Sequence, residues 1–215
     1  MKKLKSQYIT KDSSSRMHSL EVPIIGLTGG IATGKSSCSK ILVEQGYPVI
    51  CADHLIKTIY KQVETVQFIE KTFPEAISGG EIDFKKLREI AFSAVKNRET
   101  LENFLYQKLP ATFKDEYQKL GSPEFVIYDV PLLFEKGLDQ NLDQIITVYA
   151  PRTTQIERLV SRDNISKELA EKMLGEQIDI EKKKSKSNFV IENTKEFSDL
   201  EAICLELFSQ LICSE

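Results

Sequence analysis

The stretch that decides the fold runs from residue 24 to residue 37: Ile24-Ile25-Gly26-Leu27-Thr28-Gly29-Gly30-Ile31-Ala32-Thr33-Gly34-Lys35-Ser36-Ser37. It joins an apolar run to a glycine-rich turn that ends in Gly-Lys-Ser. Glycines let successive backbone N–H groups point inward around an anion, a lysine at this spacing reaches the β and γ phosphates, and the hydroxyl after it can bind Mg²⁺. The pattern therefore predicts a loop that binds the phosphates of a nucleotide.

A phosphate-binding loop needs a strand before it and a helix after it, because the N-terminus of the helix adds its positive dipole end to the anion site. Residues 22–27 form an apolar run typical of a buried strand, and residues 36–45 have the pattern of a helix that ends at Gly46. The alternative is a chance glycine turn, and the full pattern with both flanking elements argues against it. The residues expected to bind the nucleotide are Gly30, Ile31, Ala32, Thr33, Gly34, Lys35, Ser36 and Ser37, with Ser36 also a ligand of Mg²⁺.

Length and composition limit the classes of protein to consider. A chain of 215 residues is long enough for one α/β domain with additional helical parts. Its net charge of −3 and pI near 5.6 give no basic field for nucleic acid or an anionic membrane. No apolar run approaches the roughly 18 residues of a membrane span, and the cysteines lack the spacing of a zinc site or a disulfide framework. We therefore expect no nucleic-acid or membrane partner, reduced cysteines and a cytoplasmic location.

The first 20 residues differ in composition from the rest of the chain. Residues 1–20 are rich in Lys and Ser and contain no apolar segment long enough for a secretory signal. We interpret them as a flexible N-terminal tail, and we expect residues 21–215 to form a single domain. Met17 lies just before the first predicted strand, so translation that began there would remove the tail and leave the nucleotide site complete.

Two further apolar runs end in an acid. Residues 47–53 end in Asp53 and residues 124–129 end in Asp129, and both runs have the pattern of buried parallel strands. Open α/β sheets bind ligands at the carboxyl ends of their strands, so both carboxylates are candidates for the site. Asp53 could instead cap a helix that begins at His54. Asp129 could satisfy local backbone donors instead of holding Mg²⁺ or orienting groups around the γ-phosphate.

Between these two runs the pattern is helical. Residues 54–120 contain breaks but no predicted strand, and the apolar positions within residues 87–95 and 101–109 follow helical spacing, which we interpret as packing faces. So long an insertion between the second and third strands is expected to form a helical lobe that holds a second substrate.

The last third of the chain returns to strands and helices. A fourth strand at residues 144–149 leads into a helix that carries Arg158 and Arg162 on one face, because four residues separate them. The two arginines could close over phosphates as a lid or simply face solvent. The basic run 182–186 is interpreted by default as a solvated helix face, although one lysine could face the nucleotide. A fifth strand at residues 189–191 and an apolar C-terminal helix complete the pattern.

Together these motifs resemble the dephospho-coenzyme A kinase family, over residues 22–208. The pieces that carry the resemblance are Gly26-Leu27-Thr28-Gly29-Gly30-Ile31 with Gly34-Lys35-Ser36, Ala52-Asp53, Asp129-Val130-Pro131-Leu132-Leu133-Phe134-Glu135 with Gly137, Gln155 with Arg158 and Arg162, Gln177 with Lys183, and Val190-Ile191-Glu192-Asn193. Many activities share a phosphate loop, whereas the run from Asp129 to Glu135 is much more particular to this family.

The resemblance implies an α/β fold: a P-loop kinase core in which helices flank a five-stranded parallel sheet, with a helical substrate lobe at residues 54–120 and a lid at residues 151–187. It implies ATP-dependent phosphorylation of the 3′-hydroxyl of dephospho-CoA, the last step of CoA biosynthesis, with ATP, Mg²⁺ and the small-molecule substrate dephospho-CoA. We expect a monomer or a weak homo-oligomer. The alternatives are another small-molecule kinase with this core, such as a nucleoside monophosphate kinase, and a catalytically silent nucleotide-binding regulator.

The resemblance also implies roles for single residues. Asp53 would accept the proton of the ribose hydroxyl, and Arg158 or Arg162 would meet the charge that develops on the transferred group. The predicted catalytic residues are Asp53, Lys35, Arg158 and Arg162. The predicted metal ligands are Ser36 and Asp129, and Asn193 joins the loop as a nucleotide-binding residue.

The sequence departs from the family pattern in four places. Ala32 stands where a glycine is usual, and its methyl group costs little if φ is negative there. Cys51 replaces an acid two residues before Asp53, Phe84 falls where an arginine is common, and Tyr106-Gln107 replaces a His-Pro pair. The last three lie on the side of the second substrate, so they bear on substrate binding more than on the use of ATP.

Overall fold

A computed structural model describes residues 2–194 and 197–214 of the chain. The expected domain limits at residues 1 and 215, and residues 195–196, lie outside the described residues. The chain divides into two compact units. The first unit is Met1–Cys51 with Leu120–Glu215, and the second is Ala52–Lys119, which nearly coincides with the expected helical lobe.

The first unit is built on a parallel sheet of five strands in the order β3-β6-β2-β7-β8. The strands are β2 (Ile24–Gly29), β3 (Val49–Cys51), β6 (Val126–Asp129), β7 (Gln144–Tyr149) and β8 (Phe189–Glu192). Every residue of β2, β6 and β7 is buried, as expected for central strands of a parallel sheet that is covered on both faces. The five predicted strands and their parallel arrangement are confirmed.

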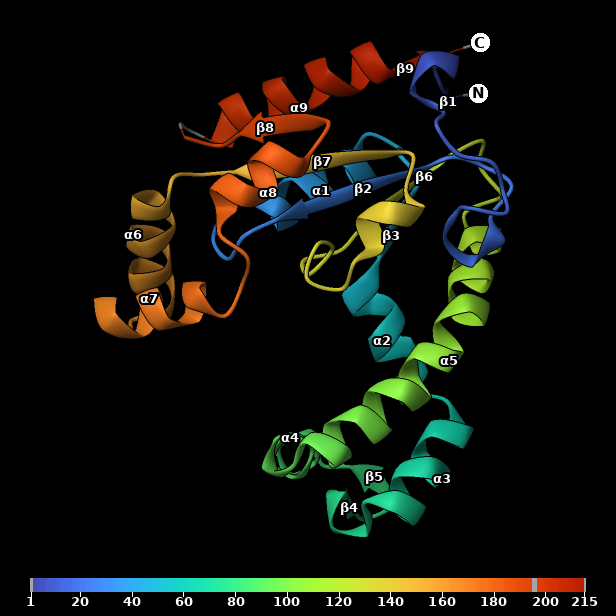
Figure 1. Ribbon diagram of the computed structural model, residues 1–215, viewed down its shortest axis with the longest axis vertical. Helices are drawn as coiled ribbons and strands as arrows, with labels where there is room; N and C mark the ends of the chain where they lie inside the picture. Colours follow the sequence, from blue (N-terminus) through green and yellow to red (C-terminus); the bar gives the residue numbers. More distant parts are fainter. Residues whose placement is uncertain (1, 195–196, 215) are drawn as a thin grey trace. The chain divides into compact units, whose positions relative to one another are not determined.

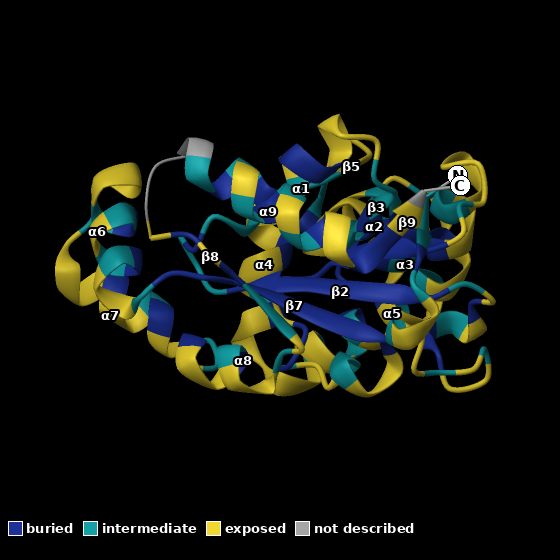
Figure 2. Cartoon of the chain, turned by 90° about the horizontal axis from the view of Figure 1, so that it is seen from above, coloured by how far each residue is buried: buried dark blue, intermediate teal, exposed yellow. Residues whose placement is uncertain are grey.

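Helices cover both faces of this sheet. The helices of the first unit are α1 (Lys35–Glu44), the 3-10 helix η4 (Leu138–Asn141), α6 (Arg152–Asp163), α7 (Lys167–Gly175), α8 (Ile180–Lys186) and α9 (Phe197–Leu211). On β7, Ile146 belongs to the core shared with α1 and α9, whereas the hydroxyl of Thr147 lies 2.6 Å from that of Ser187 at the end of α8. Since successive strand residues face opposite sides, α1 and α9 cover one face and α8 the other (Figure 2). Figure 1 shows α9 running along β8, with which it is in contact.

The N-terminal segment packs against this unit, which differs from the flexible tail expected from its composition. β1 (Lys2–Leu4) pairs with β9 (Ile212–Ser214) in a small antiparallel sheet. Two 3-10 helices follow, η1 (Ser6–Tyr8) and η2 (Met17–Ser19). The buried guanidinium of Arg16 lies 2.8 Å from the buried carboxylate of Asp143. Composition could not indicate this contact, because it joins residues 127 positions apart.

The second unit is mainly helical. Its helices are α2 (Ala52–Tyr60), α3 (Val63–Thr72), η3 (Pro74–Ala76), α4 (Phe84–Ser93) and α5 (Val95–Lys119). It also contains a hairpin, β4 (Ile77–Ser78) with β5 (Glu81–Ile82), that the sequence did not predict. Gly79 and Gly80 form its turn, and both have the positive φ that a two-residue hairpin turn requires. Strands of two residues are too short to show an alternating pattern.

The packing faces predicted in this unit are largely confirmed. Leu87, Ala91, Leu101 and Leu105 belong to one buried cluster. Val95 is instead 64% exposed, because α4 ends at Ser93 and the helical spacing does not continue across that break. Within the described part of the chain, no helix combines the length and apolarity that crossing a membrane would require.

Candidate active site

The predicted phosphate loop connects β2 to α1. β2 ends at Gly29, and α1 begins at Lys35 with Gly34 as its N-cap. Gly34 has a φ of 94°, and a Cβ atom there would come 2.1 Å from the side-chain nitrogen of Asn193. Both the backbone conformation and the space therefore require glycine at this position.

Ala32 has a φ of 59°, so the condition under which its methyl group would cost little, a negative φ, is not met. The left-handed region brings a Cβ atom close to the following carbonyl oxygen, which costs an L-residue on the order of 1 kcal/mol. Glycine has no such cost. The loop therefore keeps a strained residue at the position where its resemblance to the family would favour glycine.

The backbone amides of the loop are arranged for an anion. The first amides of a helix have no acceptor within the helix, so the N-terminus of α1 leaves donors open. Among residues 2–194 and 197–214, the amides of Ala32 and Gly34 also have no hydrogen-bond partner, whereas the amide of Thr33 donates to the carbonyl of Gly30 at 3.3 Å. Open amides at a helix N-terminus form a site that suits a phosphate group.

Lys35 and Asp129 form a buried ion pair at the loop. Their side chains are 11% and 4% exposed. Asp129 ends β6, where it lies in register with Leu27 of β2 and Cys51 of β3. Among the described residues, its carboxylate accepts a hydrogen bond from the side chain of Lys35, 94 positions earlier, and none from the local backbone donors of the alternative interpretation. The sheet thus brings together the predicted lysine and the predicted acid.

Arg158 and Asn193 approach the loop from the other elements. The side-chain amide of Asn193 donates to the carbonyl of Thr33 at 2.8 Å, so the end of β8 fixes the middle of the loop. The guanidinium of Arg158 donates to the carbonyl of Asn193 at 3.1 Å and lies 3.4 Å from the carbonyl of Ala32. Arg162 differs, because its guanidinium pairs with the carboxylate of Asp163 at 2.7 and 2.8 Å and its side chain is 62% exposed. Of the two predicted arginines, only Arg158 contacts the loop.

Asp53 belongs to the second unit and follows β3 as the second residue of α2. The helix begins at Ala52 and not at His54, so Asp53 lies in its first turn and is not its N-cap. The residue is exposed, and among the described residues its carboxylate has no hydrogen-bond or ion-pair partner. An unpaired carboxylate of this kind is available to a substrate.

The predicted metal ligands are Ser36, which is exposed, and Asp129, which is held by Lys35. In the ranges that the structure describes, no group of three or more His, Cys, Asp and Glu side chains could hold a metal ion. Mg²⁺ usually takes one or two protein ligands and completes its octahedron with phosphate oxygens and water. One hydroxyl and one carboxylate beside a phosphate site are consistent with this coordination.

Behind the loop, α1 carries a buried thiol. The sulfur of Cys38 lies 3.2 Å from that of Cys204 on α9, and both residues are fully buried. The hydrogen bond with Cys204, together with burial, raises the pKa of the Cys38 thiol well above its usual value. The thiol is therefore neutral at pH 7 and adds no negative charge behind the phosphate site.

Lys183 is fully buried, so its interpretation as part of a solvated helix face is wrong. Its ammonium group donates to the carbonyls of Pro131 at 3.0 Å and Gly29 at 3.3 Å, and it pairs with the carboxylate of Glu135 at 2.8 Å. The available signal in the sequence was its spacing of three residues from the buried Ile180, which places both on one face of α8. Lys183 thus joins the end of β2 to the segment that follows β6.

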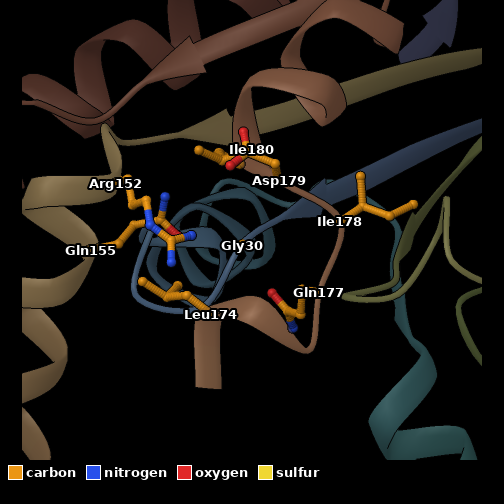
Figure 3. A pocket seen from close by; sticks show the side chains of 8 residues that line it. All are labelled: Gly30, Arg152, Gln155, Leu174, Gln177, Ile178, Asp179 and Ile180. Atoms are coloured by element: carbon orange, nitrogen blue, oxygen red, sulfur yellow. The ribbon is translucent and has the colours of Figure 1, made fainter. Parts of the chain in front are cut away.

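Two glutamines flank the first half of the loop, although the sequence assigned them no role (Figure 3). The side-chain oxygen of Gln177 accepts from the amide of Ile31 at 3.1 Å. Gln155 donates to the carbonyl of Ala150 at 2.9 Å, and its oxygen would lie 2.7 Å from a Cβ atom placed on Gly30. These two residues, with Arg152, Leu174 and residues 178–180, line a small pocket beside Gly30.

Comparisons with known proteins agree with this geometry. The model of the dephospho-CoA kinase family matches residues 23–199. A dephospho-CoA kinase from Fusobacterium nucleatum is 39% identical over 183 residues, which are 84% of this chain and 94% of the relative. One from Bacillus licheniformis is 35% identical over 185 residues, 83% of this chain and 92% of the relative.

Solved structures are similar as well. The crystal structure of TT1252 from Thermus thermophilus is 30% identical with a TM-score of 0.77, covering 88% of this chain and 98% of that chain. The dephospho-CoA kinase structure from Campylobacter jejuni is 29% identical with a TM-score of 0.65, covering 87% and 96%.

Proposed function

Since the chain belongs to the dephospho-CoA kinase family, we propose that it transfers the γ-phosphoryl group of ATP to the 3′-hydroxyl of dephospho-CoA and so produces coenzyme A. The observation that carries this function is the family match over residues 23–199, which includes the phosphate loop, the strand ends and the arginine that contacts the loop. This reaction is the last step of CoA biosynthesis.

In this proposal the loop holds the triphosphate. Phosphoryl transfer needs little covalent help from a protein, so catalysis depends on positioning and on neutralising charge. Open amides at the N-terminus of α1 would bind phosphate oxygens, and Lys35 would leave Asp129 or share its charge between the carboxylate and the phosphates. The buried position of that ion pair supports this role, because the loss of solvent strengthens the attraction of Lys35 for an entering phosphate.

Mg²⁺ would be held by Ser36 and Asp129 beside the nucleotide, where it would neutralise the charge on the phosphate oxygens. Arg158 is the arginine proposed to meet the charge on the transferred group, supported by its contact with the carbonyl of Ala32. Asn193 is proposed to contact the nucleotide from the end of β8, next to the loop that it fixes.

The second substrate is proposed to bind through the second unit, the expected lobe at residues 54–120. Asp53 would accept the proton of the 3′-hydroxyl, and its exposure and its lack of a partner among the described residues support this role. Residues 151–187, which comprise α6 to α8, are proposed to act as the lid.

The experiment is to incubate the protein with MgATP and dephospho-CoA and to detect coenzyme A by mass. Nucleoside monophosphates serve as alternative acceptors, and Lys35→Ala serves as the inactive control, since its charge is used by the phosphates. Formation of coenzyme A by the wild type alone is expected. Phosphorylation of a nucleoside monophosphate in its place, or release of no ADP with any acceptor, would contradict the proposed function.

A further inference from the structure

We propose that Gln177 is a positioning residue that braces the first half of the phosphate loop, so that the amides in the second half are held in place for the nucleotide. The inference deepens the proposed function and rests on the use of this loop for ATP. The inference is based on one hydrogen bond. Gln177 lies in the segment that joins α7 to α8, and its side-chain oxygen accepts from a backbone amide of the loop.

The amide that Gln177 engages lies early in the loop. Ile31 is the second residue after β2, and its N–H donates to the Gln177 side-chain oxygen at 3.1 Å. In the described part of the chain, the amides of Ala32 and Gly34 have no acceptor of their own. The amides of Ile31 and Thr33 are thus satisfied by the protein, and the amides of Ala32 and Gly34 stay open as donors for an anion.

The segment that carries Gln177 is itself firmly held. The amide of Ile178 donates to the carboxylate of Glu135 at 3.0 Å, and the same oxygen lies 2.8 Å from the ammonium group of Lys183. Lys183 in turn bonds to the carbonyl of Gly29, at the end of β2. The backbone beside Gln177 is therefore anchored to the strand that carries the loop, and the Gln177 side chain extends from this fixed point to the loop.

Gln155 also lies against the first half of the loop. The oxygen of Gln155 would come within 2.7 Å of a Cβ atom on Gly30, and Gln155 is 2% exposed (Figure 3). Gln155 thus lies against Gly30, and Gln177 is hydrogen-bonded to Ile31. A competing hypothesis is that the Gln177 oxygen accepts from the Ile31 amide only until a phosphate oxygen takes its place. The anchoring of Ile178 favours the brace, because it fixes the backbone from which the Gln177 side chain extends, and the affinity measurement below separates the two hypotheses.

The test replaces Gln177 by Met, which is similar in length and has no oxygen acceptor. The affinity for MgATP is measured by calorimetry, and kcat, both KM values and the melting temperature are measured on the same samples. A matched control is Gln210→Met, the same change at an exposed position of α9. A second variant, Gln177→Ala, removes the acceptor without adding an apolar group.

Loss of one hydrogen bond should weaken MgATP binding about 3- to 10-fold in both Gln177 variants. The KM for dephospho-CoA and the melting temperature should stay at the level of the Gln210→Met control. Tighter MgATP binding in the variants would contradict the bracing role and would support displacement of Gln177 by a phosphate. A lower melting temperature with unchanged MgATP affinity would overturn it in favour of a structural role alone. Failure of the wild type to bind MgATP would overturn the proposed function, and this inference with it.

Discussion

Asp53 is an exposed carboxylate two residues beyond β3, and its replacement by Asn tests whether it takes part in catalysis. Asn keeps the size and most of the hydrogen-bonding capacity but cannot take a proton. If Asp53 accepts the proton of the 3′-hydroxyl, turnover should fall about 100-fold or more, in line with the contribution of positioned acid–base groups. Steady-state kinetics measures turnover, and calorimetry should show a nearly unchanged affinity for ATP.

Thermal stability provides the control for this variant. Asp53 is exposed in the first turn of α2, where its charge is worth about 0.3–1 kcal/mol against the helix dipole, so the melting temperature should fall only slightly. Normal turnover by a stable Asp53→Asn protein would show that Asp53 is not the catalytic base and has only a structural role.

Ala32 is the strained residue of the loop, with a φ of 59°. Ala32→Gly should remove the steric cost of the left-handed conformation, although glycine loses more conformational entropy on folding. We expect a net gain of up to about 1 kcal/mol in the free energy of unfolding. Chemical denaturation measures it, with Ala111→Gly in helix α5 as the control that should lose stability. A loss at both positions would contradict the role assigned to the strain.

At the scale of elements, helix α6 carries two arginines that its period places on one face, yet only Arg158 contacts the loop. Arg158→Ala should lower turnover by roughly 10³-fold or more, as for arginines that stabilise the charge in phosphoryl transfer. Arg162→Ala should have a much smaller effect, because Arg162 is exposed and already paired with Asp163. Kinetics of the two single variants gives the comparison. Equal losses at both positions would show that Arg162 reaches the phosphates during turnover.

The N-terminal segment makes a different prediction, about stability. Arg16→Met should leave the buried carboxylate of Asp143 without its cation, which costs about 3–5 kcal/mol when one partner of a buried pair is removed. A chain that starts at Met17 lacks Arg16 as well and should be destabilised in the same way. The measurement is the free energy of unfolding by denaturant.

Lys40→Met gives the matched control for Arg16→Met, since Lys40 pairs with Glu44 on the surface with 73% and 60% exposed side chains. Exposed pairs of this kind contribute about 0–1 kcal/mol. Equal stability of the two variants would mean that the N-terminal segment adds little to the fold.

At the scale of the whole molecule, the reactivity of the four cysteines reports how well the core of the first unit is protected from solvent. Cys38 and Cys204 are fully buried, and the pKa of Cys38 is raised, whereas Cys51 is half-buried and Cys213 is exposed. Iodoacetamide should therefore modify Cys213 first and Cys51 next, and should leave the buried pair unmodified in the folded protein. Because the raised pKa keeps the Cys38 thiol neutral until the pH passes that value, a change from pH 7 to pH 8 should not make Cys38 reactive.

Mass spectrometry counts the adducts in the folded and the unfolded protein. All four cysteines should react in denaturant. Rapid modification of all four without denaturant would show that α1 and α9 separate readily, contrary to their shared core.

The sequence by itself determined the features that depend on near neighbours. The spacing from Gly29 to Ser36 specified the loop, and the apolar runs specified all five strands of the parallel sheet. The resemblance of the motifs to a kinase family specified the reaction. These features are legible because the period of a strand or a helix, and the turn chemistry of glycine, act over a few residues.

Only the tertiary structure decided which distant groups meet. The strand order places Asp129 beside the loop that carries Lys35, and the packing of α8 on the sheet buries Lys183 against Glu135. The burial of Arg16 on Asp143 likewise depends on contacts between residues more than 100 positions apart. Local sequence is the same whether a charged side chain faces solvent or a buried partner. The difference is made by the order of the strands and by the helices that cover them, since these set which charges lose water and must be paired.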